Sequence, residues 1–196
     1  MIHQQRIDQS IARWNLLDSA FYQAWSAGTL PVDSLRLYAR EYGAFILRVA
    51  DGWDAHGDQK TAEVEREHVE LWRNFAQALG TDIGEAETPA VKALVETSDK
   101  LFADRAASLG ALYAFEAQQP HTATSKLEGL RAHYDLPKTA EVYFDVHKDD
   151  WDEPAVLRER MAALTAEEQE TAAQACEQMS QALREALDAL PVAVGC

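Results

Sequence analysis

Apolar residues recur every three or four positions along most of this chain, and this spacing constrains its fold more than any other feature. In the first part of the chain, the residues that follow it are Ile7, Ile11, Trp14, Leu17, Phe21 and Trp25. Such a spacing places apolar side chains along one face of an α-helix. No segment shows the alternation of apolar and polar residues that is typical of a β-strand. The sequence therefore predicts an all-α protein.

Capping and turn residues divide this pattern into seven or eight helices. Gly28 and Pro31 end the first helix, Pro120 interrupts the fifth, and Thr165 forms a capping box with Glu168 that opens the last. The predicted helices cover residues 2–27, 33–57, 61–79, 89–106, 109–134, 139–153 and 165–190, with a restart at Pro154. We expect them to pack around one core as a compact single-domain bundle that spans residues 1–196.

Composition excludes several classes of function. The formal net charge of −15 repels phosphate backbones and anionic membrane surfaces, so neither nucleic acid nor a membrane is an expected partner. No apolar run is long enough to span a bilayer, and the first residues lack the apolar core of a signal peptide, so we expect a cytoplasmic protein. Cys176 and Cys196 are the only cysteines, which leaves neither a disulfide framework nor a cysteine-based zinc site.

One carboxylate, Glu116, lies within an apolar helical run that extends to Pro120. A charged group is seldom fully buried unless it is paired or bound to a metal, so Glu116 needs partners. The best candidates are His68 and His147, each on the apolar side of its own predicted helix. Two imidazoles and one carboxylate are the ligand set of non-haem Fe(II) oxygenases, and helix bundles build such sites from inward-facing side chains. We therefore predict that His68, Glu116 and His147 bind a metal.

Simpler interpretations exist for each of these residues. A lone histidine on an apolar face is more often a hydrogen-bonded core residue than a ligand. Glu116 could instead form a buried ion pair with Arg48 or Arg66. The acidic run at residues 149–153 could bind a cation, but a solvated turn that precedes a helix is the favoured interpretation.

Four segments resemble proteins of a known superfamily. They are Leu-Tyr-Ala-Phe-Glu-Ala-Gln-Gln-Pro at 112–120, Lys-Leu-Glu-Gly-Leu at 126–130, Val-Tyr-Phe-Asp-Val-His at 142–147, and the helix at 67–80 that begins Glu-His-Val-Glu-Leu-Trp. Together they resemble the haem-oxygenase-like superfamily, within it the branch of TENA-type proteins, PqqC-type cofactorless oxidases and CADD-like di-iron oxygenases. The resemblance covers about residues 35–165. It implies a compact helical bundle with its site between helices and a small-molecule substrate.

The ligand pattern of the CADD-like oxygenases matches this chain in part. Those proteins carry a Glu and, seven residues later, a His on one helix, a Glu on a second, and a His–Asp–His series on a third. His68, Glu116 and His147 match three of these positions. The other three positions hold Thr61, Trp151 and Pro154, which are poor iron ligands or none.

Neighbouring acids offer replacements for the missing ligands. Glu63 or Glu65 could replace the first carboxylate, and Asp150 could replace the aspartate. At about 100° per residue, Glu65 lies about 60° from His68 around its helix. We expect iron as the cofactor, in a mononuclear or dinuclear site, and neither haem nor a nucleotide.

Three functions follow from these observations. The favoured one is a non-haem iron oxidase or oxygenase that uses dioxygen to act on a small organic substrate. The second is a metal-free PqqC- or TENA-like enzyme, in which His68 and His147 serve as general acid and base. The third is a degenerate, non-catalytic binding or partner protein. Helical faces beyond the core favour a homodimer.

Overall fold

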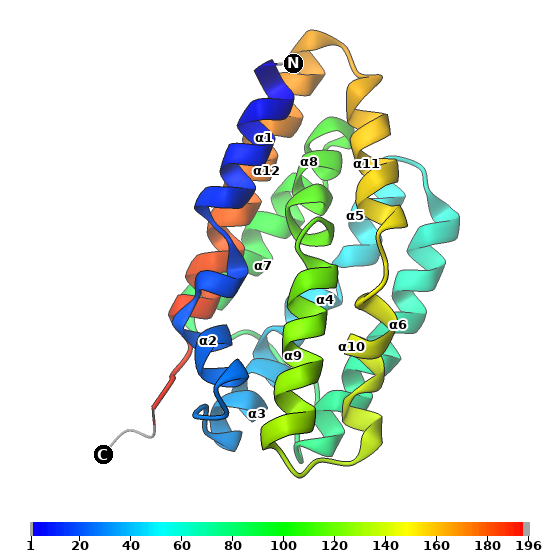
Figure 1. Ribbon diagram of the computed structural model, residues 1–196. Coiled ribbons are helices and arrows are strands. Elements are labelled where there is room, and N and C mark those ends of the chain that lie inside the picture. Colours follow the sequence, from blue (N-terminus) through cyan, green and yellow to red (C-terminus); the bar gives the residue numbers. More distant parts are fainter. Residues whose placement is uncertain (1, 194–196) are drawn as a thin grey trace.

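The computed structural model describes residues 2–193, and every regular element in that range is helical (Figure 1). With η for a 3-10 helix, the elements are α1 (Ile2–Arg13), η1 (Leu16–Asp18), α2 (Ala20–Ser26), α3 (Val32–Glu41), α4 (Gly43–Ile46), α5 (Val49–Ala55), α6 (Gln59–Ala78), α7 (Pro89–Leu101), α8 (Arg105–Glu116), α9 (Gln119–His133), η2 (Lys138–Ala140), α10 (Val142–His147), α11 (Asp152–Ala162) and α12 (Ala166–Asp188). The predicted all-α bundle is confirmed. Cys196 lies outside the described residues.

Several predicted helices are divided into consecutive segments. The first ends at Arg13 because the side chains of Asn15 and Ser19 accept hydrogen bonds from the backbone N–H groups of Leu17 and Tyr22, and so cap new helices. The predicted helix over residues 33–57 divides into α3, α4 and α5. The prediction of single continuous helices over these two stretches is therefore wrong.

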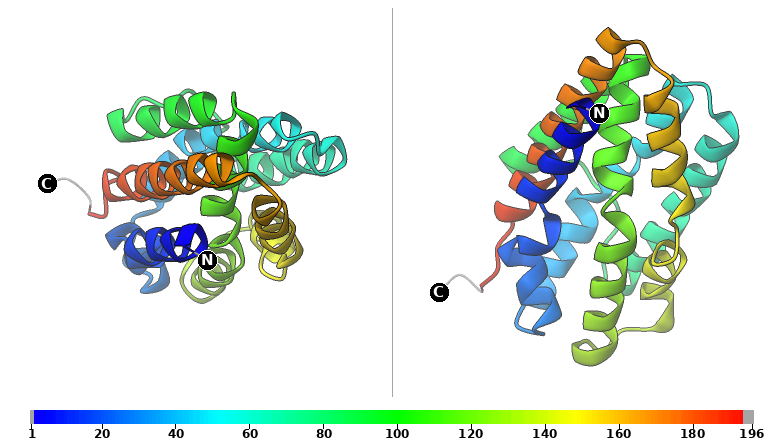
Figure 2. Two further views of the ribbon diagram at one scale, coloured as in Figure 1. Left: turned by 90° about the horizontal axis from the view of Figure 1, so that it is seen from above. Right: turned by 45° about the horizontal axis from the view of Figure 1, so that its top comes forward.

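Helix α8 occupies the centre of the bundle, where it contacts α5, α11 and α12 (Figures 1 and 2). Every residue from Ala106 to Glu116 is buried. Gly110 permits the close approach of α8 to α12, because a Cβ atom at this position would lie 1.8 Å from the carbonyl oxygen of Ala172 on α12. The last residue of α8, Glu116, is thus held deep inside the protein by packing on several sides.

The chain bends between α8 and α9, two residues before Pro120. Pro120 occupies the first turn of α9, where its missing N–H leaves no helical hydrogen bond unmade. The predicted interruption at this proline is therefore confirmed. Helix α10 packs against both α6 and α9, so the helices that carry His68 and His147 lie side by side.

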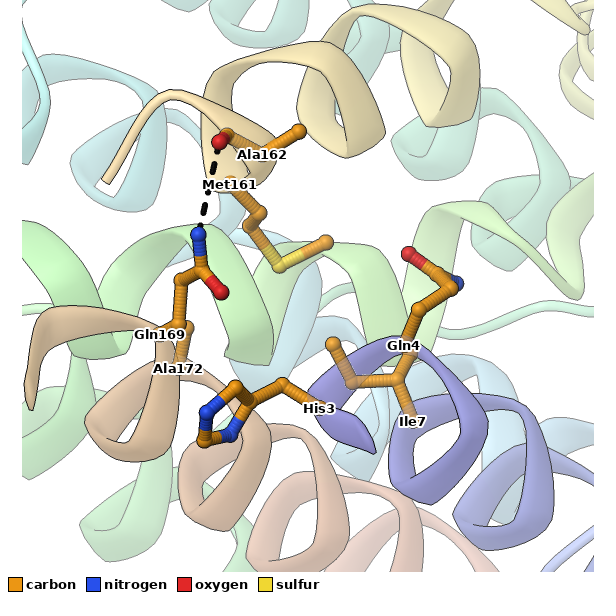
Figure 3. A pocket seen from close by; sticks show the side chains of 7 residues that line it. All are labelled: His3, Gln4, Ile7, Met161, Ala162, Gln169 and Ala172. Carbon is orange, nitrogen blue, oxygen red and sulfur yellow. Dashed lines mark hydrogen bonds between the residues drawn. The ribbon is translucent and has the colours of Figure 1, made fainter. Parts of the chain in front are cut away.

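Pockets also form where helices diverge. One, of about 170 Å³, lies between α1, α11 and α12, where the Gln169 side chain donates a hydrogen bond to the carbonyl oxygen of Ala162 (Figure 3). His3 is the one ionisable side chain among its lining residues. Within the described part of the chain, no helix is both long and apolar enough to cross a membrane.

Candidate metal centre

Glu116 is buried without a hydrogen-bond partner at one of its oxygens. The residue is 2% exposed, and its Oε1 atom makes no hydrogen bond within the described structure. Burial, together with the negative charges of Glu153, Glu65 and Asp150, raises the pKa of this carboxyl well above its ordinary value. The surroundings therefore favour its neutral form unless a cation is present.

The predicted alternative partners of Glu116 are engaged elsewhere. Arg48 pairs with Asp99 and donates a hydrogen bond to the carbonyl oxygen of Ala44. Arg66 pairs with Asp54 on the outside of the bundle. The interpretation of Glu116 as one half of a buried ion pair with either arginine is therefore wrong.

His147 presents a free ring nitrogen inside the protein. It is 1% exposed and ends α10, with its Nδ1 atom 2.6 Å from the carbonyl oxygen of Tyr143. A carbonyl only accepts, so Nδ1 carries the hydrogen and Nε2 keeps its lone pair. Nε2 is buried and has no partner in the described structure. Burial lowers the pKa of His147 to about 4, so the ring is neutral and suited to bind a metal.

His68 lies on α6 with its ring centroid 4.6 Å from that of His147. Its Nδ1 atom lies 3.1 Å from Oε1 of Glu65, which is itself buried. Burial disfavours the charged imidazolium of His68 and so lowers its pKa. The hydrogen bond with Glu65 and the negative charges of Glu65 and Asp150 have the opposite effect and are stronger, so the pKa of His68 is raised overall. One possible ligand atom from each of Glu65, His68 and His147 lies within 4.8 Å of the others.

Two further carboxylates reach this cluster from the junction between α10 and α11. Burial and the charge of Glu65 raise the pKa of Asp150. The same causes, with the charge of Asp150, raise the pKa of Glu153 to about 9. The prediction of a fully solvated turn is therefore wrong at these positions, although it holds for Asp149 and for Trp151, which is 50% exposed.

The structure thus distinguishes the suggested replacement ligands that lie near the cluster from the one that does not. Glu65 and Asp150 face the cluster, whereas Glu63 is exposed on the surface of α6. Sequence reasoning considered Glu153 only as part of the acidic run at residues 149–153 and did not assign it to this site. The available signal was its spacing, because His147, Asp150 and Glu153 follow one another at intervals of three.

This donor set fits iron. Glu65, His68 and His147 bring ligand atoms within 4.8 Å of one another; Glu116 is outside that group of three, but the charges of Glu65, Asp150 and Glu153 act on its carboxyl. Two donor atoms, Nε2 of His147 and Oε1 of Glu116, are buried without partners in the described structure. Four carboxylates cannot all ionise in a buried space unless cations offset their repulsion. Mixed carboxylate–imidazole sets that include Glu-x-x-His, the spacing of Glu65 and His68, bind two irons in other helix bundles.

A buried lysine lies deeper in the same bundle. Lys126 is 3% exposed, and its Nζ atom lies 3.5 Å from the hydroxyl oxygens of Tyr22 and Tyr38. It forms no ion pair with any carboxylate of residues 2–193. Burial lowers its pKa to about 7, so much of this amine is uncharged at neutral pH. Sequence analysis gave no signal for it.

Solved structures share this fold. A TenA homologue from Pseudomonas syringae superposes with a TM-score of 0.74 at 14% identity, covering 95% of this chain and 91% of that one. A CADD-like protein of unknown function from Nostoc punctiforme gives a TM-score of 0.63 at 20% identity, covering 95% and 94% of the two chains. These matches confirm the haem-oxygenase-like fold that the sequence motifs implied.

Sequence comparison identifies related proteins. A 4-aminobenzoate synthase from Chlamydia pneumoniae is 29% identical over 164 residues, which cover 73% of each chain. Another from Nitrosomonas europaea is 30% identical over 178 residues, covering 74% of this chain and 71% of that one. The family model described as "iron-containing redox enzyme" matches residues 44–187. This chain therefore belongs to the family of iron-containing redox enzymes.

Proposed function

We propose that this protein is a non-haem iron enzyme that uses dioxygen to oxidise a small organic substrate bound between its helices. The observation that carries this proposal is the pair of buried donor atoms without partners, Nε2 of His147 and Oε1 of Glu116, beside the Glu65–His68 pair. Family membership supports iron as the metal. Iron would supply the electron transfers that let dioxygen react with the substrate.

Six residues would hold the metal, either as one ion or as two. They are Glu65, His68, Glu116, His147, Asp150 and Glu153. The carbonyl oxygen of Tyr143 fixes the tautomer of His147, so that Nε2 faces the site as an acceptor. Glu65 orients His68 through Nδ1 or binds the metal with its second oxygen. Because the pKa of Glu116 and that of Glu153 are raised, metal binding should release protons at neutral pH.

The names of the relatives suggest the reaction class. Both sequence relatives described above are called 4-aminobenzoate synthase, so we propose an oxidation that leads to an aromatic amino acid of this kind. The uncharged amine of Lys126 and the hydroxyl groups of Tyr22 and Tyr38 supply a polar interior that can accept or donate a proton.

A metal-free enzyme is the second candidate. The neutral Lys126 amine favours it, since a buried base near pH 7 can act without a metal. In that case the site residues would bind and orient the substrate directly. Titration with Fe(II) distinguishes the iron-dependent enzyme from the metal-free enzyme.

Anaerobic Fe(II) titration of the chelator-treated protein is the test of the proposal. We expect a saturable rise in melting temperature and release of protons on binding. Glu116→Gln should weaken iron binding by about tenfold or more, because a buried ligand is lost. Glu159→Gln, an exposed acid on α11, serves as the control. Equal iron affinity in wild type and Glu116→Gln would contradict the proposed site.

A further inference from the structure

A pocket away from the proposed iron site has the character of an anion-binding site. It has a volume of about 320 Å³, and its lining residues come mainly from the start of α8, the end of α11 and the start of α12. Typical small-molecule pockets begin at about 300 Å³, so this one can take a small ligand. Its lining combines Arg105, Arg160 and His56 with the apolar side chains of Leu109 and Leu164.

Arg105 brings to this pocket a guanidinium group that forms no ion pair within the described structure. It is exposed at the first position of α8, and it makes no ion pair and no side-chain hydrogen bond with the residues that the structure describes. Most other arginines of the described chain are paired with a carboxylate, as in Arg131–Glu141 and Arg184–Asp188. The chain has a net charge of −15, so an unpaired guanidinium group beside a pocket differs from the mainly acidic character of the protein.

Arg160 lies on the same pocket, with its guanidinium group already bound to His56 and Asp58. One guanidinium nitrogen of Arg160 lies 2.8 Å from Nδ1 of His56, and another lies 2.7 Å from Asp58. Burial and the positive charge of Arg160 lower the pKa of His56 to about 4. The imidazole ring of His56 is therefore neutral, and its Nδ1 atom accepts a hydrogen bond from Arg160. Two fixed contacts hold the Arg160 fork in place.

The acidic residue of the lining is turned toward its own helix. Glu168 accepts hydrogen bonds from the backbone N–H and the hydroxyl group of Thr165, as the capping box of α12 requires. Those two bonds occupy its Oε2 atom. The pocket therefore combines the unpaired guanidinium group of Arg105 with an apolar floor, since Leu109 is buried and Leu164 partly buried.

We propose that this pocket binds a small organic carboxylate with an apolar body. A guanidinium pairs with a carboxylate through two parallel hydrogen bonds, and the free Arg105 offers that fork. The leucine floor favours a ligand whose remainder is apolar over a bare inorganic anion. This inference is independent of the iron chemistry, because none of these residues belongs to the proposed metal site.

Calorimetric titration with benzoate tests the proposal, with neutral benzamide and inorganic phosphate as comparison ligands. We expect saturable benzoate binding at low ionic strength and at least tenfold weaker binding of both comparison ligands. Arg105→Gln should weaken benzoate binding by about tenfold, and the fold should persist because Arg105 is exposed and unpaired. Arg13→Gln, an exposed arginine on α1, controls for the loss of one charge and should change the affinity by less than about twofold.

Three results would overturn the proposal. They are the absence of saturable benzoate binding, benzamide or phosphate binding as tight as benzoate, and an Arg105→Gln variant that keeps the wild-type affinity. Amide chemical shifts of Leu109 and Leu164 give a second measurement. Both should move on benzoate addition in wild type and in Arg13→Gln, and should move less in Arg105→Gln at the same benzoate concentration. Circular dichroism confirms that each variant is folded.

Discussion

Replacing Glu153 with Gln should stabilise the metal-free protein at neutral pH, although Glu153 is a proposed ligand. Burial and the neighbouring carboxylates raise the pKa of Glu153 from 4.5 to about 9. The folded protein therefore keeps a proton that the unfolded chain releases above pH 4.5. Unfolding is favoured as the pH rises through this window, and the effect levels off once the folded state also ionises. Gln removes this titration and retains the shape of the side chain.

The size of the effect follows from that pKa. Between pH 4.5 and about 9, each pH unit lowers the free energy of unfolding of wild type by about 1.4 kcal/mol relative to the variant. At pH 7 the accumulated difference is about 3 kcal/mol. A buried Gln that lacks a partner adds a constant cost of about 1–3 kcal/mol. The diagnostic quantity is therefore the change with pH in the stability difference between wild type and variant. The titrations of His147 and Lys126 occur in both proteins and do not contribute to that difference.

Urea unfolding of chelator-treated proteins at several pH values between 5 and 8.5 measures this slope. The variant should gain stability relative to wild type as the pH rises, and Fe(II) should stabilise wild type more than the variant. Glu159→Gln on the same helix is the matched control and should give no such slope. A constant stability difference between wild type and Glu153→Gln across this range would refute the reasoning that Glu153 lies in a crowded, buried carboxylate cluster.

Two further predictions concern other parts of the bundle. Burial lowers the pKa of Lys126 from 10.5 to about 7, so below pH 7 the folded state holds a costly charge. At about 1.4 kcal/mol per pH unit this difference corresponds to about 5 kcal/mol, so Lys126→Met should raise the free energy of unfolding at pH 6 by up to that amount. Urea unfolding at pH 6 checks this, and a destabilised variant would show that the amine is favourably solvated. Gly110→Ala should lower the stability by about 3 kcal/mol, because its Cβ atom would meet the Ala172 carbonyl oxygen at 1.8 Å. Thermal unfolding measures it, with Gly80→Ala, where a Cβ meets nothing but φ is +75°, as a comparison for backbone strain alone.

The sequence was informative wherever a feature depends on one helix. Helical spacing predicted the all-α bundle, and the isolated carboxylate of Glu116 marked the interior position that the structure confirms as buried. The role of His68, Glu116 and His147 as metal ligands stays a prediction, as does the extent of the domain over residues 1–196. The structure places these three residues in one interior region, which their spacing along the chain could not establish.

The position of the carboxylates beyond His147 depends on tertiary structure. Asp150, which the sequence suggested as a replacement ligand, lies in the turn between α10 and α11, and Glu153 lies in the first turn of α11. Their spacing at intervals of three after His147 was a signal, but the course of that turn could not be read from it. Lys126 was missed for a similar reason, because its burial results from the packing of Tyr22, Tyr38 and Phe144 around it. A lysine in a polar helix is ordinarily exposed.

Metal content tests the central claim most directly. The protein is expressed with added iron, purified without chelator and analysed for metals, beside His147→Ala and the control His133→Ala, whose histidine is exposed on α9. The account predicts about one or two irons per chain in wild type and in the His133→Ala control, and a loss of iron in His147→Ala. Iron-free wild type, or equal iron in all three proteins, would contradict a metal centre built on His147.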